Sequence, residues 1–483
     1  MRRTKIVATL GPATSTPEQI GALIAAGMNV ARLNFSHGTQ EEHGRTIAAV
    51  REAAGRLGRP VAIMQDLQGL KIRTGPLAGG GPVELEPGEV FAITTRQVPG
   101  SAQEVSTSYQ ELPRDVRPGE ALLVSDGLLE LVIEEVSGDT VRTRVVHGGA
   151  LREHQGINLP ATAVSAPVLT PKDRDDLRFG LAQGVDYVAV SFVRRAADVR
   201  QVAELIADAG HDTPIVAKIE KPQALDELEQ ILELVGGVMV ARGDLGVEMP
   251  LEQVPTIQKE LIAEANCRGV PVITATQMLE SMVRNPRPTR AEASDVANAI
   301  YDGTDAVMLS AESAIGAFPA AAVTMMARIA AHADGRRGQH AKPPPSKMWP
   351  PAVSVAGVIG QAAGAVTGTP PIRAVVALTR TGNTARLIAH LRPPVPILAL
   401  TPYEHICRRL SLVWGVTPVR ADYDDDLAAV ERTVNGLVQA HGLAQPGDWI
   451  VLTGGHPLTR HATTNFLKVI QVAAAGHAAD HES

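Results

Sequence analysis

Short apolar runs alternate with helical patterns in two blocks of the first three hundred or so residues. The first run is followed by a helical pattern over 17–26, which opens with Thr16-Pro17, a favourable cap and first turn. Another helical pattern covers 40–57. The strand-like runs occupy 5–10, 30–35, 61–66, 186–192, 214–219, 237–243, 270–276 and 306–311. Eight strands alternating with helices predict an α/β fold, a (β/α)8 or TIM barrel with one closed parallel sheet.

The barrel pattern is interrupted between the third and fourth strands. The intervening stretch is rich in Gly and Pro and holds short alternating runs, among them 128–133 and 140–146. Alternation of apolar and polar residues over such short runs is typical of strands with one buried face. We therefore expect a small inserted β barrel, a lid domain, over 70–164, and a catalytic barrel domain over 1–69 and 165–342.

A third domain follows a proline-rich, polar stretch at 333–351, which has the composition of a linker. Three strand-like runs then alternate with three helical patterns. The predicted strands are 374–379, 396–400 and 448–453, and the predicted helices are 352–366, 384–391 and 426–441. This pattern predicts a compact C-terminal α/β domain over 346–483.

Polar side chains close most of the predicted barrel strands. Lys218 and Glu220 stand two residues apart at the end of one run, and Arg242 and Asp244 repeat that spacing one strand later. Side chains two apart on a strand face the same way, so we expect these four groups to converge. The other strand-closing residues are Arg32, Asn34, Ser36, Asp66, Thr274, Thr276, Ser310 and Glu312. They predict one site at the carboxyl ends of the barrel strands.

The residue types at this predicted site favour phosphorylated or enolate chemistry. Buried strands do not carry charges without partners. Two carboxylates beside a lysine suit a divalent metal that holds an anionic ligand. A structural network of ion pairs at the strand rim explains either charged run alone equally well. The repetition of the pattern on two neighbouring strands favours a ligand site.

Composition narrows the classes of partner. The chain carries 45 Lys and Arg against 52 Asp and Glu, a net charge of -7 without any basic run, which argues against nucleic acid. The two cysteines, Cys267 and Cys407, lack metal-ligand spacing and indicate a reduced, cytoplasmic setting. A first strand beginning at Lys5 leaves no room for a signal peptide, and no apolar stretch is long enough to span a membrane.

The sequence resembles the pyruvate kinase family along nearly its whole length. The order of barrel, inserted β domain and C-terminal α/β domain is similar to that family, and so is the opening strand 4–12. Longer motifs carry most of the resemblance. They are Ala31-Arg32-Leu33-Asn34-Phe35-Ser36-His37-Gly38, Ala217-Lys218-Ile219-Glu220, Ala241-Arg242-Gly243-Asp244-Leu245-Gly246 and Ala275-Thr276-Gln277-Met278-Leu279-Glu280-Ser281-Met282.

This resemblance implies the last step of glycolysis, in which phosphoenolpyruvate phosphorylates ADP and the enolate is protonated to pyruvate. Enzymes of phosphoryl transfer mainly position groups and neutralise charge. The resemblance implies that Glu220 and Asp244 hold Mg2+ or Mn2+. It also implies that Lys218 stabilises the charge developing on the transferred group, and that Arg32 pairs with a phosphoryl oxygen.

The same resemblance assigns the substrate carboxylate and the proton. Backbone N–H groups of Gly243 and Asp244 would bind the carboxylate, since glycine permits close approach. The Thr276 hydroxyl would bind it too and join a proton relay with Ser310 and Glu312. In the stretch 310–314, Ala311 and Ser313 replace the glycine and threonine that are usual in the family. Both replacements are conservative, so the relay remains plausible.

The resemblance also implies a nucleotide site at Asn34, His37 and Arg73, so that ADP and ATP are expected partners. Two residues of the predicted lid domain differ from those usual in the family. Gln155 stands where many members carry a lysine that faces the nucleotide, which leaves Arg73 as the main cation there. Leu70 stands at the hinge of the insertion, where proline is usual.

Many family members require K+ at residues matching Asn34, Ser36, Asp66 and Leu67. Members that need K+ typically carry glutamate where this chain has Lys71, and threonine and lysine where it has Leu67 and Gln68. An ammonium group attached to the chain can replace the charge of a bound cation. We therefore expect that K+ is not required, against the simpler interpretation of Lys71 as a solvated hinge lysine.

The C-terminal domain holds a candidate effector site. Its residues are Thr379, Arg380, Thr381, Gly382, Asn383 and Thr384, which follow a strand and open a helix. Hydroxyls and free N–H groups at a helix start suit a phosphate, although an ordinary strand-to-helix turn explains them almost as well. The family binds effector phosphates on a similar loop, and Gly454-Gly455-His456 is the candidate opposing wall of that site. The resemblance also implies that the protein is a homotetramer.

Two other functions fit parts of the pattern. A metal-dependent aldolase acting on the enolate of pyruvate would also use a Glu and Asp pair, but it needs no nucleotide lid. A phosphate sensor without catalysis would be expected to lose Lys218, Glu220 or Asp244, and all three are present.

Overall fold

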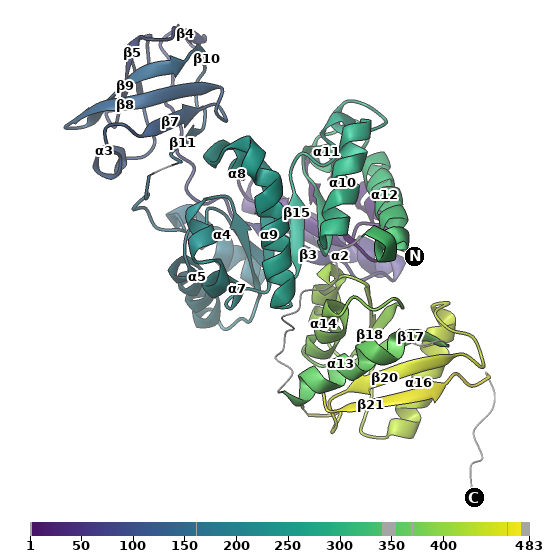
Figure 1. The fold of residues 1–483 in the computed structure, drawn as a ribbon. Coiled ribbons are helices and arrows are strands. Elements are labelled where there is room, and N and C mark those ends of the chain that lie inside the picture. Colours follow the sequence, from purple (N-terminus) through teal and green to yellow (C-terminus); the bar gives the residue numbers. More distant parts are fainter. Residues whose placement is uncertain (1, 161, 341–353, 369–370, 461, 475–483) are drawn as a thin grey trace, which may run out of the picture.

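The computed structural model describes residues 2–160, 162–340, 354–368, 371–460 and 462–474. Figure 1 shows three parts: a central barrel, an all-β domain beyond one end of it and the C-terminal domain beyond the other. Within the described residues, no helix is both long and apolar enough to cross a membrane.

The central part is a closed barrel of eight parallel strands, as predicted, ordered β1-β16-β15-β14-β13-β12-β3-β2. The strands are β1 Lys5–Leu10, β2 Val30–Asn34, β3 Ala62–Asp66, β12 Tyr187–Val190, β13 Ile215–Ile219, β14 Gly237–Ala241, β15 Val272–Ala275 and β16 Ala306–Leu309. Several of them end one or two residues before the predicted boundary. The polar residues that close these runs leave the strand for turns and short helices, where the alternation of side chains no longer holds.

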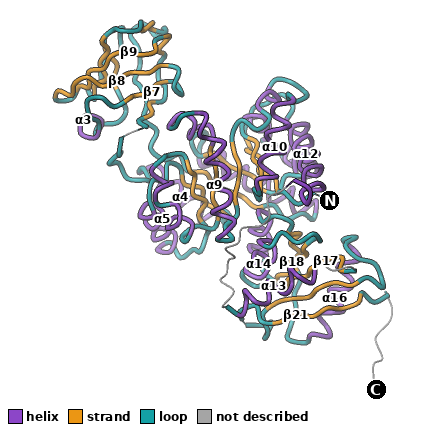
Figure 2. The backbone as a smooth tube through the Cα atoms, viewed as in Figure 1, coloured by secondary structure: helices purple, strands orange, loops and turns teal. Residues whose placement is uncertain are grey.

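Helices cover the outside of the barrel (Figure 2). They are α1 Pro17–Ala26, α2 Gln40–Leu57, α4 Pro171–Ala182, α5 Ala196–Asp208, α6 Gln223–Asp226, α7 Leu228–Leu232, α8 Arg242–Glu248, α9 Val254–Cys267, α10 Arg290–Asp302, α11 Ala311–Ala314 and α12 Pro319–His340. Helices α1, α2, α4 and α10 each begin with a threonine cap whose side chain accepts the N–H of the third helical residue. Such reciprocal capping satisfies helix ends that would otherwise lack partners.

The inserted part is all-β apart from one short helix and has its own hydrophobic core. Its elements are β4 Val83–Leu85, β5 Val90–Thr94, β6 Glu104–Ser106, α3 Leu112–Asp115, β7 Ala121–Val124, β8 Leu129–Ser137, β9 Thr140–His147, β10 Gly149–Leu151 and β11 Ile157–Asn158. The described strands form a six-stranded sheet and a separate two-stranded sheet. The structure thus has the predicted separate all-β domain, with one difference from a barrel: β6 and β11 lie at opposite edges of the larger sheet, which stays open.

The C-terminal part is an α/β domain with a five-stranded sheet ordered β19-β18-β17-β20-β21. Its elements are α13 Val355–Thr367, β17 Ile372–Leu378, α14 Asn383–His390, β18 Ile397–Thr401, α15 Glu404–Arg409, β19 Val416–Arg420, α16 Leu427–Ala440, β20 Trp449–Gly454 and β21 Phe466–Gln471. The sequence predicted β17, β18 and β20 but missed both edge strands. The predicted linker at 333–351 was wrong at its start, where α12 continues to His340, and 341–353 lie outside the described residues.

The C-terminal domain closes the amino-terminal end of the barrel. Leu412 is fully buried and packs with residues of the barrel interior. Asp186, directly before β12, accepts hydrogen bonds from Arg51 and Arg408 at 2.8 Å each. The Tyr187 hydroxyl donates to the backbone carbonyl of Arg409 at 2.8 Å. Apolar and charged contacts therefore join the two parts at the end of the barrel opposite the strand-closing polar residues.

Candidate active site

Lys218 lies at the centre of the carboxyl end of the barrel. Its ammonium group donates to Ser191 Oγ at 2.7 Å and lies 2.9 Å from Glu220 Oε1 and 3.3 Å from Asp66 Oδ1. Burial alone would lower the pKa of Lys218, but Asp66 and Glu220 outweigh it and hold that pKa above the ordinary lysine value. The lysine therefore stays charged at any physiological pH.

Arg32 and Asp66 form a second buried pair on the neighbouring strands β2 and β3. The Nε and Nη2 atoms of Arg32 lie 2.7 and 2.6 Å from Asp66 Oδ2, and Nη1 donates to Thr9 Oγ1 at 3.0 Å. Burial works against the ionised carboxyl, but Lys218 and Arg32 outweigh it and hold the pKa of Asp66 below its usual range. Two cations are thus fixed around one carboxylate.

Glu220 and Asp244 are the two carboxylates predicted to hold a metal. Glu220 is buried and accepts the backbone N–H of Phe192 at 2.7 Å. Burial first, and then repulsion from Asp244, raise the pKa of Glu220, although Lys218 opposes this. No cluster of three or more His, Cys, Asp and Glu side chains forms a metal cage in the described ranges. Two carboxylates with further oxygens from substrate and water fit Mg2+, which usually keeps waters and binds few protein groups.

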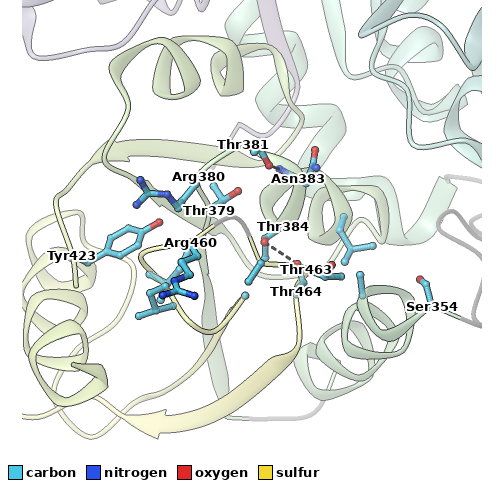
Figure 3. Close-up of a pocket in the computed structure, with 16 residues that line it drawn as sticks. Ser354, Thr379, Arg380, Thr381, Asn383, Thr384, Tyr423, Arg460, Thr463 and Thr464 are labelled. Atoms are coloured by element: carbon cyan, nitrogen blue, oxygen red, sulfur yellow. Dashed lines mark hydrogen bonds between the residues drawn. The ribbon is translucent and has the colours of Figure 1, made fainter. Parts of the chain in front are cut away.

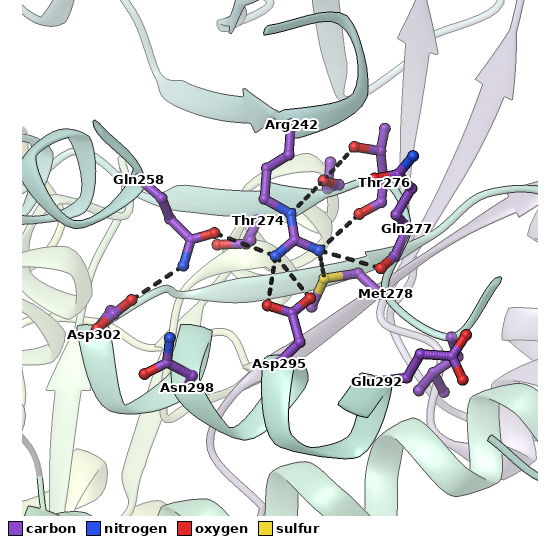
Figure 4. A network of polar contacts seen from close by, with 12 residues as sticks. Arg242, Gln258, Thr274, Thr276, Gln277, Met278, Glu292, Asp295, Asn298 and Asp302 are labelled. Atoms are coloured by element: carbon purple, nitrogen blue, oxygen red, sulfur yellow. Dashed lines mark hydrogen bonds and ion pairs between the residues drawn. The ribbon is translucent and has the colours of Figure 1, made fainter. Parts of the chain in front are cut away.

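Arg242 does not join this site, which corrects the prediction made from strand alternation. It is the first residue of α8, and its side chain points away into a separate network (Figure 4). Its guanidinium donates to Asp295 Oδ1 at 2.8 Å and to the backbone carbonyl of Thr276 at 2.7 Å. Further contacts run to the carbonyls of Ala275 and Gln277 and to the side chains of Gln258 and Met278. Arg242 therefore holds the backbone of 275–277 in place and does not face the site.

Thr276 stands directly after β15, and its backbone lies in the left-handed region at a φ of 66°. Gln277 follows at 51°, and non-glycine residues adopt such values at a cost. The Thr276 hydroxyl accepts the N–H of Gly243 at 2.7 Å and donates to the carbonyl of Ala275 at 2.7 Å. The structure therefore brings Thr276, Gly243 and the start of α8 together, as predicted.

Glu312 is buried and braces two backbone turns. One carboxylate oxygen accepts the N–H of Ser310 at 2.7 Å, and the other accepts the N–H of Leu279 at 3.0 Å. The hydroxyl of Ser313 donates to the carbonyl of Thr9 at 2.9 Å. The end of β16 is thereby tied to β1 and to the loop that carries Thr276. Thr274, by contrast, lies on the outer side of β15, away from the barrel interior, and its hydroxyl donates to Thr304 Oγ1 at 3.0 Å.

A cavity of about 310 Å3 lies between the inserted domain and the barrel. Lys71 and Arg73 line it from the hinge side, and Asp244 lines it from the barrel. Burial, then Lys218 and Arg73, lower the pKa of Lys71, so Lys71 lies within the field of the central lysine. His37 belongs to the same cationic surroundings, because partial burial, then Lys71, Arg73 and Arg32, lower its pKa.

The remaining predicted residues make hydrogen bonds to other parts of the protein. The Asn34 side chain accepts the N–H of Ser36 at 3.2 Å, and the carbonyl of Leu67 accepts the Ser191 hydroxyl at 2.9 Å. Gln155 stays within the lid, where its amide donates to Ser125 Oγ at 2.9 Å. Arg73 is exposed and donates to the carbonyl of His154 at 3.1 Å.

Sequence reasoning missed three residues of the site. Ser191 links Lys218 to Asp66, which is 3.5 Å from its hydroxyl. Lys221 pairs with Glu248 at 2.5 Å, and Asn158 of the lid donates to the same Glu248 oxygen at 2.8 Å. A signal existed for Ser191, which closes the apolar run of β12 just as the predicted residues close theirs. No comparable signal marked Lys221, because its partners come from other elements.

The predicted effector loop also lines a cavity, of about 400 Å3, within the C-terminal domain. Figure 3 shows Arg380, Tyr423 and Arg460 around one side of it, and Thr384 and Thr464 joined by a hydrogen bond of 2.8 Å on another. Gly382 has a φ of 86°, and its N–H donates to Thr379 Oγ1 at 2.9 Å. Of the predicted opposing wall 454–456, the cavity lining includes Gly455.

The fold and the first site together define a (β/α)8 barrel protein with paired buried cations and carboxylates at the carboxyl ends of its strands. Models described as "pyruvate kinase, barrel domain" and "pyruvate kinase, alpha/beta domain" match residues 1–323 and 358–470. Pyruvate kinase 2 of Synechocystis is 47% identical over 479 residues, which is 98% of this chain and 80% of that protein. The chain therefore belongs to the pyruvate kinase family and is a phosphotransferase.

Other known proteins agree with this membership. Pyruvate kinase of Geobacillus stearothermophilus is 46% identical over 476 residues, 97% of this chain and 80% of that protein. The crystal structure of a pyruvate kinase from Cryptosporidium parvum superposes with a TM-score of 0.90 at 36% identity, covering 98% of this chain and 96% of the other. The similarity thus extends over all three parts of the fold.

Proposed function

We propose that this chain transfers the phosphoryl group of phosphoenolpyruvate to ADP and then protonates the enolate to pyruvate, as the last step of glycolysis. The observation that carries the proposal is the buried Lys218 between Glu220 and Asp66, at the barrel end that faces the lid cavity. A fixed cation at this position meets the charge that develops as the phosphoryl group leaves the enolate oxygen.

The surrounding residues take separate roles in this proposal. Arg32 holds a phosphoryl oxygen, because Asp66 and Thr9 already fix its guanidinium in place. The N–H groups at the start of α8, at Gly243 and Asp244, bind the substrate carboxylate in this proposal, and the Gly243 N–H would exchange Thr276 Oγ1 for the carboxylate.

The proton for the methylene carbon passes through hydroxyl groups. Thr276 contacts the start of α8, where the substrate carboxylate would lie, and Ser310 comes directly after the next strand, β16. Glu312 contributes by fixing the turns that carry both groups. Asn34, His37 and Arg73 are the nucleotide contacts in this proposal; Arg73 lines the lid cavity, and His37 lies within the field of Lys71 and Arg73.

Glu220 and Asp244 would hold the divalent metal, Mg2+ or Mn2+. When bound there, the metal would neutralise charge on the carboxylate and phosphoryl oxygens of the substrate. Glu220→Gln and Asp244→Asn should each weaken Mn2+ binding at least tenfold, measured as free Mn2+ by electron paramagnetic resonance. Glu204→Gln, at an exposed carboxylate on α5, serves as the control. Unchanged Mn2+ titrations in both site variants would place the metal elsewhere.

A coupled assay tests the reaction itself. With phosphoenolpyruvate, ADP and lactate dehydrogenase, NADH should be consumed only while ADP is present. Pyruvate release without ADP would instead favour an aldolase or a phosphatase. Phosphate binding without any turnover would favour a sensor.

K+ independence is the second part of the proposal. Lys71 lines the lid cavity, and burial, then Lys218, lower its pKa, which supports a role for its ammonium group as the substitute charge. Activity in a buffer free of K+ and NH4+, with ionic strength held by a bulky organic cation, should match activity in KCl. The variant Lys71→Glu should become responsive to K+, or inactive if Leu67 and Gln68 must change with it. Strong activation of the parent by KCl would contradict this part.

Regulation is the third part. The loop 379–384 and Arg460 surround a cavity large enough for a phosphorylated effector, and hydroxyl, amide and guanidinium donors line it. A screen of sugar phosphates and nucleotides should shift the saturation curve of phosphoenolpyruvate, and Arg460→Met should abolish the shift. A homotetramer and a cytoplasmic location are expectations that come with the family, and sedimentation analysis tests the first of them.

A further inference from the structure

Three side chains join the inserted lid domain to the barrel at one buried carboxylate. Glu248, the last residue of α8, accepts hydrogen bonds at Oε1 from Lys221 at 2.5 Å and from Asn158 at 2.8 Å. Glu248 and Lys221 are buried, and Asn158 belongs to β11 of the lid. We call these three residues the lid clamp. We propose that the lid clamp, given the metal site proposed above, sets the separation of Glu220 and Asp244 and makes it depend on the position of the lid.

Each carboxylate of the proposed metal pair stands close in the chain to a residue of the lid clamp. Lys221 directly follows Glu220 after the end of β13. Asp244 and Glu248 are four residues apart on α8, a spacing that puts both on the same face of a helix. The ion pair of the lid clamp therefore bridges the same two elements as the metal pair.

Charge gives the lid clamp its effect on the metal pair. Glu220 and Asp244 carry like charges and repel each other. Lys221 and Glu248 carry opposite charges, and their contact draws α8 towards the end of β13. Salt screens a buried pair much less than an exposed one. The lid clamp therefore opposes the repulsion, so that a metal ion meets two carboxylates already held close together.

Two contacts tie the lid to α8. Asn158 lies on β11, which pairs with β7 in the six-stranded sheet, so its bond to Glu248 connects that sheet to the helix. The turn between β7 and β8 also lies against α8, because a Cβ on Gly127 would lie 4.0 Å from Val247 Cγ1. Figure 1 shows α8 on the side of the barrel next to the lid. A movement of the lid therefore acts on the helix that carries Asp244.

The second oxygen of Glu248 keeps the lid clamp reversible. Among the residues that the structure describes, Oε2 of Glu248 is buried and has no hydrogen-bond partner. A buried acceptor without a partner costs free energy. Lifting the lid would expose this oxygen to water and remove that cost, at the loss of the bond from Asn158. Because these two effects oppose each other, a nucleotide that contacts the lid can shift its position, and its effect on metal affinity is matched by an equal effect of metal on nucleotide affinity.

Mn2+ binding to the full chain without substrates tests the proposal, measured as free Mn2+ by electron paramagnetic resonance. Lys221→Met should weaken Mn2+ binding at least threefold, and Lys221→Arg should restore part of it. Loss of a nearby positive charge would by itself tighten the binding of a cation, so the direction of the change separates positioning from charge alone. The double variant Lys221→Met with Glu248→Gln keeps the net charge and leaves no buried charge unpaired, and it should still weaken binding.

Asn158→Ala tests the lid side of the clamp without any change of charge. It should also weaken Mn2+ binding, and it should raise the hydrogen exchange of the α8 amides, measured by mass spectrometry. Gln155→Ala is its control, because the Gln155 side chain bonds within the lid. Lys259→Met controls for the lysine, because it breaks an ion pair of 2.5 Å with Asp302 on the outer helices. Both controls should leave Mn2+ binding and α8 exchange unchanged.

Glu220→Gln, titrated alongside, separates failure of the metal site from failure of the lid clamp. Melting temperatures show whether each variant is folded. If Glu220→Gln binds Mn2+ like the parent, the proposed metal site fails, and the proposal fails with it. If Glu220→Gln weakens binding while the double variant at 221 and 248 binds as tightly as the parent or more tightly, the metal site stands and the lid clamp is overturned. Unchanged Mn2+ binding and α8 exchange in Asn158→Ala would overturn the dependence on the lid.

Discussion

Lys218 illustrates how single residues create the active site. A lysine with 8% of its surface exposed would ordinarily lose its proton in a dry interior. Here two carboxylates and the Ser191 hydroxyl hold the charged form in one position. The cation is thus in place before any substrate binds, which avoids reorganisation at the moment of phosphoryl transfer.

Lys218→Met should reduce kcat by about a hundredfold or more, since one electrostatic group at the developing charge is lost. The fold should persist, because Arg32 still pairs with Asp66 at 2.6 Å. The coupled assay measures kcat, and the melting temperature checks the fold. Lys5→Met, which removes a buried lysine at the opposite end of the barrel, is the control for loss of a buried cation alone. Residual activity within a few fold of the parent would contradict the role of Lys218.

At the scale of elements, the sequence predicted the barrel well, because its signals are local. The pattern Thr-Pro-x-Gln at 16–19 predicts the start of α1, and the structure has that cap. Alternation placed Lys218 correctly, since Lys218 still belongs to β13. The same reasoning was wrong for Arg242, because Met239 faces the barrel interior and Val240 faces the helices, so Arg242 falls on the outer side, where α8 begins. Which face of a wholly apolar strand is the inner one leaves no mark in apolar periodicity.

Arg242→Met tests what this helix start does for catalysis. The guanidinium holds the carbonyls of Thr276 and Gln277, whose backbones adopt left-handed values. Without it we expect Thr276 to lose its position and kcat to fall about tenfold to a hundredfold. That range corresponds to about 1.4–2.7 kcal/mol, as expected for hydrogen bonds to a charged group.

Mn2+ binding distinguishes positioning from a general structural defect in this variant. Because Arg242 points away from Glu220, the Mn2+ titration of Arg242→Met should stay close to that of the parent. Arg242→Lys should recover part of kcat through a single donor. A variant that loses metal binding and kcat together would show that Arg242 supports the whole barrel end instead.

At the scale of the whole molecule, the features that escaped prediction are contacts between distant segments. Leu412 fills the barrel from a domain more than a hundred residues after the last barrel strand. Lys221, Glu248 and Asn158 join barrel and lid through three separate elements. Such contacts depend on how finished parts pack together, and a single sequence carries no periodic signal for that packing.

The junction between barrel and C-terminal domain also buries a lysine. Lys5, the first residue of β1, donates to the carbonyl of Val416 on β19 at 2.5 Å. Burial, and then Arg2, lower the pKa of Lys5 to about 7, although Asp334 opposes this. In the unfolded chain the same lysine has its ordinary pKa of about 10.4. Between these two values the unfolded chain binds more protons, so this group makes stability rise with pH.

Lys5→Met should therefore flatten the dependence of stability on pH. The cost of burying the charge is fully present below pH 7 and disappears as the pH rises through about 10.4. The parent should gain in melting temperature between pH 7 and pH 9.5 relative to the variant, and the variant should be the more stable of the two at pH 7. Leaving the Val416 carbonyl without its donor subtracts about 1–3 kcal/mol from that advantage. Lys468→Met, at an exposed lysine, controls for the loss of any lysine. If the melting temperatures of the parent and Lys5→Met depended equally on pH, Lys5 would remain charged at neutral pH without cost to stability.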